Sequence, residues 1–112
     1  MKMVIAIVRT TALEGIVKAL EAEGVRGMTI FEVKGTGEQV QLFRPYTIHK
    51  KIEIIIPDDR ADRVVNIIVE HGHTGLAGDG LIAVLPVECV MKIRRKEEIC
   101  DADFKEKKEV NL

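Results

Sequence analysis

The sequence predicts an α+β fold of the ferredoxin-like class: a double β-α-β sandwich with two helices on one face of a four-stranded antiparallel sheet. Three observations predict it. The chain has 112 residues, which suits a single domain. Short β-branched runs alternate with helical apolar spacing, as β-α-β units do. This β-α-β pattern occurs twice along the chain, once in each half.

The first unit occupies the N-terminal part of the chain. A strand is predicted at 4–8, where apolar residues occupy both faces. Thr11 and Glu14 have the spacing of a capping box and predict a helix start. The apolar stripe that follows consists of Leu13, Ile16, Val17 and Leu20. Its spacing predicts a helix of about 13 residues ended by Gly24. A second strand is predicted at 28–34.

The second unit repeats this order. A strand at 51–56 precedes Pro57, and Asp58 with Asp59 predicts a helix start with acidic caps. The second apolar stripe consists of Ala61, Val64, Val65 and Ile68. After the glycines that end this helix, a fourth strand is predicted at 81–85, again apolar on both faces.

The predicted strands at 4–8 and 81–85 carry apolar residues on both faces, which indicates how the chain assembles. Two helices cover only one face of a sheet, so the other face needs a second cover. A homo-oligomer is the leading interpretation. In the alternative, this face is closed within the chain by a fifth strand that folds back, built from Val87, Val90, Met91 and Ile93.

Composition excludes several classes of function. The net charge of −1 and the 4% of aromatic residues argue against a nucleic-acid partner. Two cysteines, Cys89 and Cys100, are too few for a disulfide scaffold, which indicates a reducing, cytoplasmic setting. No nucleophile and base pair, acid dyad or three-ligand metal set stands out, so neither catalytic nor metal-binding residues are predicted, and the chain is not expected to be an enzyme.

Two loops could carry function. The segment 35–49 is longer than a hairpin needs and is a candidate interaction arm; alternatively, it is a long hairpin whose apolar side chains pack locally. The segment 74–80 is glycine-rich, and glycines let backbone amides converge on an anion, although a tight turn explains it equally well. Alternation in 92–96 predicts a strand with Lys92 and Arg94 on one face, where they could neutralise a phosphate. A solvated edge strand with protective charges fits these residues as well.

Several motifs together resemble the PII nitrogen-regulatory signal-transduction proteins. The most specific is Thr-Gly-Leu-Ala-Gly-Asp-Gly at 74–80. The others are Gly-Met-Thr at 27–29, Glu-Val-Lys-Gly-Thr-Gly at 32–37, Lys-Ile-Glu-Ile at 51–54 with Pro57 and Asp58, and Lys-Ile-Arg at 92–94. The resemblance covers residues 1–96 in unbroken order, as a PII-like domain with a flexible loop at 36–49. Residues 97–112 are then a charged C-terminal tail.

The resemblance implies a homotrimer that binds ATP, ADP or AMP in clefts between subunits, with Mg²⁺ and 2-oxoglutarate as further possible ligands. It implies control of a membrane transporter or metabolic enzyme, in nitrogen or related metabolism, through the long loop. The nucleotide-binding residues it implies are Thr29, Gly35, Gly37, Glu53, Ile55, Thr74, Gly78, Asp79, Gly80, Lys92 and Arg94. Gln39 and Arg9 match positions near 2-oxoglutarate and the metal. Phe43, Arg44 and Tyr46 lie in the partner-binding loop.

The chain departs from the family pattern at four charged positions. Glu38 stands where an arginine is usual, His49 and Leu81 where lysines are usual, and Lys92 where an arginine is usual. Fewer positive charges near the phosphates favour a nucleotide with fewer phosphates. The alternative function is a trimeric module of the same fold that binds another small effector or a metal, without nucleotide sensing.

Overall fold

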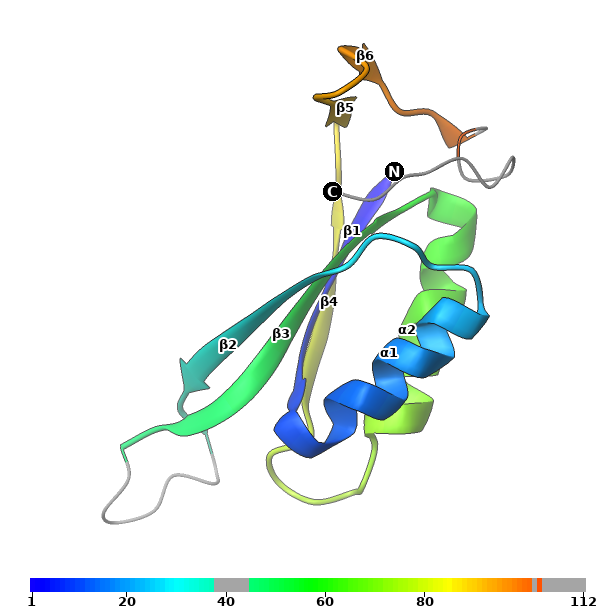
Figure 1. Ribbon diagram of the computed structural model, residues 1–112. Helices are drawn as coiled ribbons and strands as arrows, with labels where there is room; N and C mark the ends of the chain where they lie inside the picture. Colours follow the sequence, from blue (N-terminus) through cyan, green and yellow to red (C-terminus); the bar gives the residue numbers. More distant parts are fainter. Residues whose placement is uncertain (38–44, 102, 104–112) are drawn as a thin grey trace.

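The computed structural model describes residues 1–37, 45–101 and 103. The elements in order are β1 (Lys2–Arg9), a 3₁₀ turn η1 (Thr10–Ala12), α1 (Leu13–Ala22), β2 (Thr29–Gly35), β3 (Thr47–Ile56), α2 (Asp58–Gly72), β4 (Gly80–Pro86), β5 (Met91–Lys92) and β6 (Glu97–Glu98). β2, β3, β1 and β4 form one antiparallel sheet in that order. Both helices lie on one face of it (Figure 1). The predicted ferredoxin-like α+β fold is confirmed.

The core lies between the helices and one face of the sheet. Alternate residues of β1 and β3 point into it, as the two-residue period of a strand requires. The helices meet them with apolar stripes, including Ile16 and Leu20 from α1. The buried apolar residues are Val4, Ala6, Val8, Ile16, Leu20, Val25, Ile52, Ile54, Ile56, Ala61, Val64, Ile67 and Ile68.

The opposite face of the sheet, here called the open face, carries no helix. Its register places Ile5 beside Ala83 and Ile7 beside Leu81, so an apolar band crosses β1 and β4. Leu81 is 60% exposed and Leu85 is 41% exposed. The prediction that both strand faces are apolar while the helices cover only one is confirmed.

The predicted helix caps are wrong in detail. A 3₁₀ turn precedes α1, whose N-cap is Ala12. No side chain forms a capping hydrogen bond to the 3₁₀ turn or to α1. The capping box expected from Thr11 and Glu14 therefore does not form. α2 begins after Pro57, and no side chain caps it either. Asp58 instead accepts a salt bridge from the amino group of Met1 at 2.9 Å, which joins the start of α2 to the start of β1.

The C-terminal segment also differs from the predictions. Met91 and Lys92 pair with Glu98 and Glu97 in a separate two-stranded ribbon, so the fifth strand does not fold back over the open face. Residues 93–96 form its turn, so the predicted strand alternation of Lys92 and Arg94 is wrong. Residues 97–98, expected in the tail, are the second strand of this ribbon.

The strands β2 and β3 are paired further toward the long loop than expected. Their ladder runs to the pair of Gly35 and Thr47, so residues 47–49 belong to β3 and not to the loop. This pair of strands projects beyond the helices (Figure 1). In the part of the chain that is described, no helix has the length and apolar composition that a membrane crossing requires.

Candidate functional site

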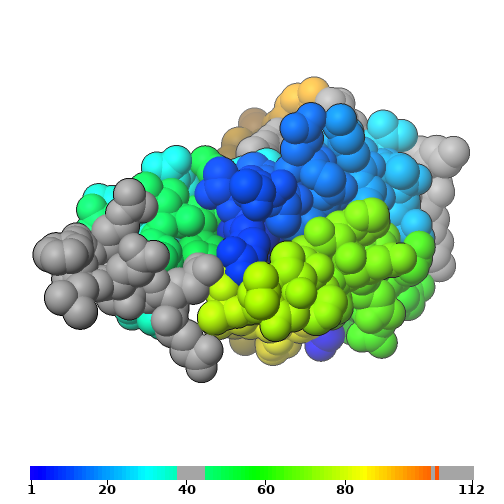
Figure 2. Space-filling model, turned by 90° about the horizontal axis from the view of Figure 1, so that it is seen from below, coloured from blue at the N-terminus to red at the C-terminus, as the bar shows by residue number. Residues whose placement is uncertain are grey.

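Three segments distant in sequence meet at one end of the sheet. They are the end of β1 at Arg9, the start of β3 near His49, and the glycine-rich loop 74–80 between α2 and β4. Figure 2 views the molecule from this end and shows the end of β1 and η1 (dark blue) against the loop (yellow-green). β1 and β3 bring Arg9 and His49 side by side because these residues are opposite each other in the ladder.

Asp79 fixes the shape of the glycine-rich loop. Its carboxylate accepts hydrogen bonds from the backbone N–H of Thr74 at 2.7 Å and of Gly75 at 2.9 Å. The Thr74 hydroxyl also donates to it. Arg9 donates from Nε at 3.0 Å, and its Nη2 donates to the Ala77 carbonyl at 2.6 Å. The loop is therefore tied both to itself and to the end of β1.

These donors lower the pKa of Asp79. The Thr74 hydroxyl contributes most, followed by the Thr74 N–H and, with smaller effects, Arg9 and the Gly75 N–H; burial opposes them. Each stabilises the charged carboxylate, which therefore stays ionised far below the usual range for aspartate. The loop keeps its anchor throughout the physiological pH range.

We expect Asp79→Asn to remove a pH-dependent part of the stability. Because the pKa of Asp79 is lower in the folded state, its stabilisation is fully present above the unfolded value of about 4 and is lost as the pH falls through the folded value. The difference in urea midpoint between wild type and Asp79→Asn should be constant from neutral pH to about 4 and shrink below it. A difference that stays constant below that pH would contradict the assignment. Asp62→Asn, on the exposed side of α2, is the control.

His49 joins the loop to the base of the long arm. Its Nε2 lies 2.9 Å from the Gly78 carbonyl oxygen, which can only accept, so Nε2 carries a proton. Its Nδ1 lies 3.2 Å from the Thr47 hydroxyl, which is also 3.4 Å from the Gly35 carbonyl oxygen. A chain of contacts therefore runs from Gly35 at the end of β2 to Gly78 in the loop.

Positive φ angles explain the glycines of this loop. Gly75, Gly78 and Gly80 have φ of 85°, 98° and 98°, a region that side chains with a Cβ rarely adopt. Gly80 is also at the close approach of β4 to β1, where a Cβ would lie 1.7 Å from the Ile7 carbonyl oxygen. The sequence therefore needs glycine at Gly80 for two independent reasons.

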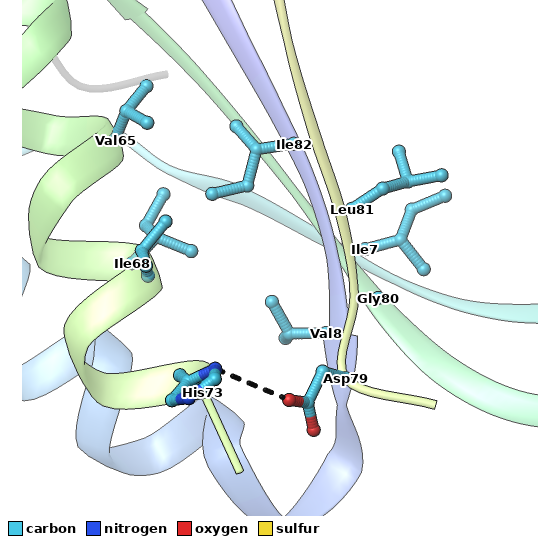
Figure 3. A pocket seen from close by; sticks show the side chains of 11 residues that line it. Ile7, Val8, Val65, Ile68, His73, Asp79, Gly80, Leu81 and Ile82 are labelled. Carbon is cyan, nitrogen blue, oxygen red and sulfur yellow. Dashed lines mark ion pairs between the residues drawn. The ribbon is translucent and has the colours of Figure 1, made fainter. Parts of the chain in front are cut away.

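A groove of about 410 Å³ lies beside the loop, between the C-terminal half of α2 and β4 (Figure 3). Val65, Ile68 and Ile82 form its apolar wall, and Asp79 with Gly80 lies at its polar end. His73 points toward Asp79 there, with Nδ1 at 3.8 Å from the carboxylate. Of the residues predicted to bind nucleotide, the groove includes Asp79 and Gly80.

Thr74 and Gly78 belong to the same glycine-rich loop, and the remaining predicted residues lie in three other places. Thr29 and Glu53 are paired across β2 and β3, and Ile55 shares their face, which is the open face. Gly35 and Gly37 lie at the base of the long loop, and the Thr47 hydroxyl links Gly35 to His49. Lys92 and Arg94 lie on the β5–β6 ribbon, where Lys92 is only 8% exposed.

The glycine-rich loop and the ribbon lie at opposite ends of the molecule. Gly80 begins β4 and Pro86 ends it, so about 20 Å of strand separates the loop from the start of the segment that leads to Lys92. Figure 1 shows the loop below the sheet and the ribbon above it. Within one copy of the chain, the two predicted phosphate-binding groups do not meet.

Three predicted residues, Gln39, Phe43 and Arg44, lie outside the described residues. Tyr46 is described, and Lys34 Nζ lies 4.8 Å from the centroid of its ring. Among residues 1–37, 45–101 and 103, no group of three histidine, cysteine or acidic side chains is placed to hold a metal ion.

Sequence reasoning missed three contacts of the site. Arg9 was expected near a small ligand, and its contact with the Asp79 carboxylate was not foreseen. His49 and His73 were not singled out as partners of the loop, although both approach it. No local sequence signal marks these contacts, since Arg9 and His49 become neighbours only through the register of β1 and β3 in the folded sheet.

Comparison with known proteins gives one consistent family. The model of the family described as nitrogen regulatory protein P-II matches residues 1–97. The chain is 42% identical over 106 aligned residues to nitrogen regulatory protein P-II 2 of Methanothermobacter thermautotrophicus, covering 87% of this chain and 92% of the relative. It is 39% identical over 107 aligned residues to nitrogen regulatory protein P-II 1 of Escherichia coli K12, covering 88% and 96%.

Proposed function

The chain belongs to the family of nitrogen regulatory proteins P-II, and on this premise we propose that it is a trimeric regulator that binds an adenine nucleotide between its subunits. In this proposal, nucleotide binding changes the loop at 36–49, which controls a transporter or metabolic enzyme. Mg²⁺ and 2-oxoglutarate are further ligands of the same cleft. The protein acts by binding and not as an enzyme.

The observation that carries this proposal is the separation of the expected binding residues. Gly78 to Gly80 lie at one end of β4, and Lys92 with Arg94 lies beyond the other. A single copy cannot bring them to one ligand across about 20 Å of strand. Two copies can, if the ribbon of one reaches the loop of the next. This supports sites in the clefts between copies.

The open face supports assembly independently. Its apolar band on β1 and β4 includes Leu81 and Leu85, which are both exposed. Exposed apolar bands of this kind favour burial against another protein surface. Thr29, Glu53 and Ile55 lie on the same face, so assembly through it brings them toward a neighbouring copy.

The charges around the loop favour ADP or AMP over ATP. At the two described positions where the family usually has lysine, His49 is engaged with Gly78, and Leu81 is apolar. Each charge-assisted hydrogen bond to a phosphate contributes about 1.5–3 kcal/mol, so two fewer lysines weaken triphosphate binding most. Calorimetric titration with ATP, ADP and AMP, each with and without Mg²⁺ and 2-oxoglutarate, measures this order directly.

Arg94→Ala should weaken nucleotide binding by about 10- to 100-fold, because it removes a charge-assisted contact with a phosphate. Calorimetry on wild type and variant measures the change. Arg26→Ala removes the same charge from an exposed site between α1 and β2 and should leave the affinity unchanged.

Two outcomes would contradict the proposal. One is equal nucleotide affinity in Arg94→Ala and wild type. The other is the absence of nucleotide binding below millimolar concentration, combined with a rise in melting temperature for another effector, which would favour the effector-binding module.

A further inference from the structure

Two cysteines that have no part in the proposed nucleotide site lie next to the β5–β6 ribbon. Cys89 and Cys100 are both free thiols and both exposed. They flank the ribbon, one before β5 and one after β6. They are eleven positions apart in the sequence, so only the register of the ribbon decides whether they can meet.

The register of the ribbon, extended two residues beyond its strands, puts the two cysteines at opposite positions. Lys92 pairs with Glu97 and Met91 pairs with Glu98. One hydrogen bond lies just beyond this ladder, where the Ile99 N–H donates to the Val90 carbonyl oxygen at 2.9 Å. The next pair outward in the same register is Cys89 with Cys100.

The hydrogen-bond pattern defines the type of this pair. The Ile99 N–H donates to Val90, so in the extended register the next positions outward, 89 and 100, correspond to a non-hydrogen-bonded pair. Directly opposite Cα atoms in such pairs lie about 4.5 Å apart, within the range of about 4.4–6.8 Å found in disulfides. In such a pair the backbone groups point away from the partner strand. Cys100 follows this pattern, since its N–H donates to the Asp103 carboxylate at 3.0 Å and its carbonyl accepts from the Asp103 N–H at 3.1 Å.

The side chains also share a face of the ribbon. The Cys89 Sγ donates to the Glu98 carboxylate at 3.5 Å. Glu98 is two residues before Cys100, and residues two apart in a strand project from the same face. The Cys89 thiol is therefore directed toward the face that carries Cys100.

We propose that Cys89 and Cys100 form a reversible disulfide that closes the β5–β6 ribbon. With hydrogen peroxide as oxidant, one thiol releases its proton and the thiolate attacks a peroxide oxygen; the O–O bond breaks, a sulfenic acid forms, and the hydroxide that leaves takes up the released proton as water. The second thiol then attacks the sulfenic sulfur, so that the S–S bond forms, the S–O bond breaks and a second water leaves. The two sulfurs lose two electrons in total to the peroxide. A small thiol reverses the reaction by exchange, because both sulfurs are exposed.

The ring closed by this disulfide contains Lys92 and Arg94. Holding the ribbon closed orders these side chains before a ligand arrives, so the oxidised protein should bind nucleotide a few-fold more tightly. This consequence rests on the proposed function. The disulfide itself does not, and its test needs no nucleotide.

Peptide mapping of the full chain tests the disulfide. The protein is treated with peroxide, its remaining free thiols are blocked with an alkylating reagent, and it is then digested with trypsin. Trypsin cleaves after Lys92 and after Lys96, so the two cysteines fall in different peptides that only a disulfide can join. We expect the joined pair from protein that migrates as a single chain on a non-reducing gel, and its loss after a thiol reductant. Cysteines that only add oxygen, or a joined pair found only in cross-linked dimers, would overturn the proposal.

Two carboxylate variants probe the local chemistry. Glu98 raises the pKa of Cys89, chiefly by accepting a hydrogen bond from its thiol, and so keeps the thiol protonated. Glu98→Gln should therefore speed disulfide formation near neutral pH severalfold. Glu97→Gln is the matched control, because Glu97 is adjacent and pairs with Arg95, so its rate should equal that of wild type. Equal rates in the two variants would contradict the placement of Cys89 against Glu98.

Calorimetry separates the disulfide from its consequence. If reduced protein binds nucleotide and oxidation does not change the affinity, the prediction that the closed ribbon tightens nucleotide binding is wrong, while the proposed function stands. If reduced protein binds no nucleotide but the disulfide forms, the proposed function fails and the disulfide stands.

Discussion

Gly80→Ala should destabilise the protein by about 3 kcal/mol or more, a large part of the total stability of a small domain. An added Cβ would lie 1.7 Å from the Ile7 carbonyl oxygen. The backbone cannot relax easily, because φ at Gly80 is 98° and β1 is held between β3 and β4. Relief requires β4 to separate from β1 at the pair of Val8 and Gly80. The midpoint of urea denaturation measures the loss.

Gly15→Ala is the matched control. Gly15 lies in α1, and a Cβ there meets nothing within 4 Å. Alanine is the better helix former, so this variant should gain about 0.5–1 kcal/mol. The same chemical change therefore has opposite signs at the two positions. A Gly80→Ala midpoint equal to that of wild type would show that β4 does not approach β1 as described.

The strands and helices were predictable because their signals are local. The β-branched run at 4–8 and the apolar stripe through Ile16 and Leu20 fix which face of each element is buried. The start of α2 at Asp58 was predictable as well, but the helix caps were not, because each cap depends on a single hydrogen bond. Thr11 lies in a 3₁₀ turn, and Asp58 binds the Met1 amine. Such choices between alternative partners are decided by the folded structure and not by the local sequence.

The site was predictable only in part, for a related reason. The glycine-rich loop was recognisable from its composition and from the family resemblance. Its anchor was not, since Arg9 and Asp79 are 70 positions apart and meet only because β1 ends beside the loop. The role of Lys92 and Arg94 was expected from a strand that proves to be a turn after two residues. In both the loop and the ribbon, contacts between segments distant in sequence decide the structure, and the local sequence pattern does not.

The separation of loop and ribbon predicts how trimers behave when they are assembled from two different variants. If each nucleotide site takes the loop from one copy and the ribbon from another, a defect in the loop and a defect in the ribbon can lie in different copies. A mixed trimer then contains some sites in which both parts are intact. Two defective proteins can restore binding that neither shows alone.

Refolding an equal mixture of Gly78→Ala and Arg94→Ala chains should therefore restore about a quarter of the nucleotide sites, since each intact site needs one chain of each kind in the right order. Gly78 has φ of 98°, so alanine there strains the loop, while Arg94→Ala affects only the ribbon. Calorimetry counts the sites, and light scattering checks that the mixture is trimeric. A mixture of Lys92→Ala and Arg94→Ala is the control and should restore none, because every ribbon in it is defective. If the first mixture also restores none while its trimers form, loop and ribbon do not combine across copies, and the site proposed here is wrong.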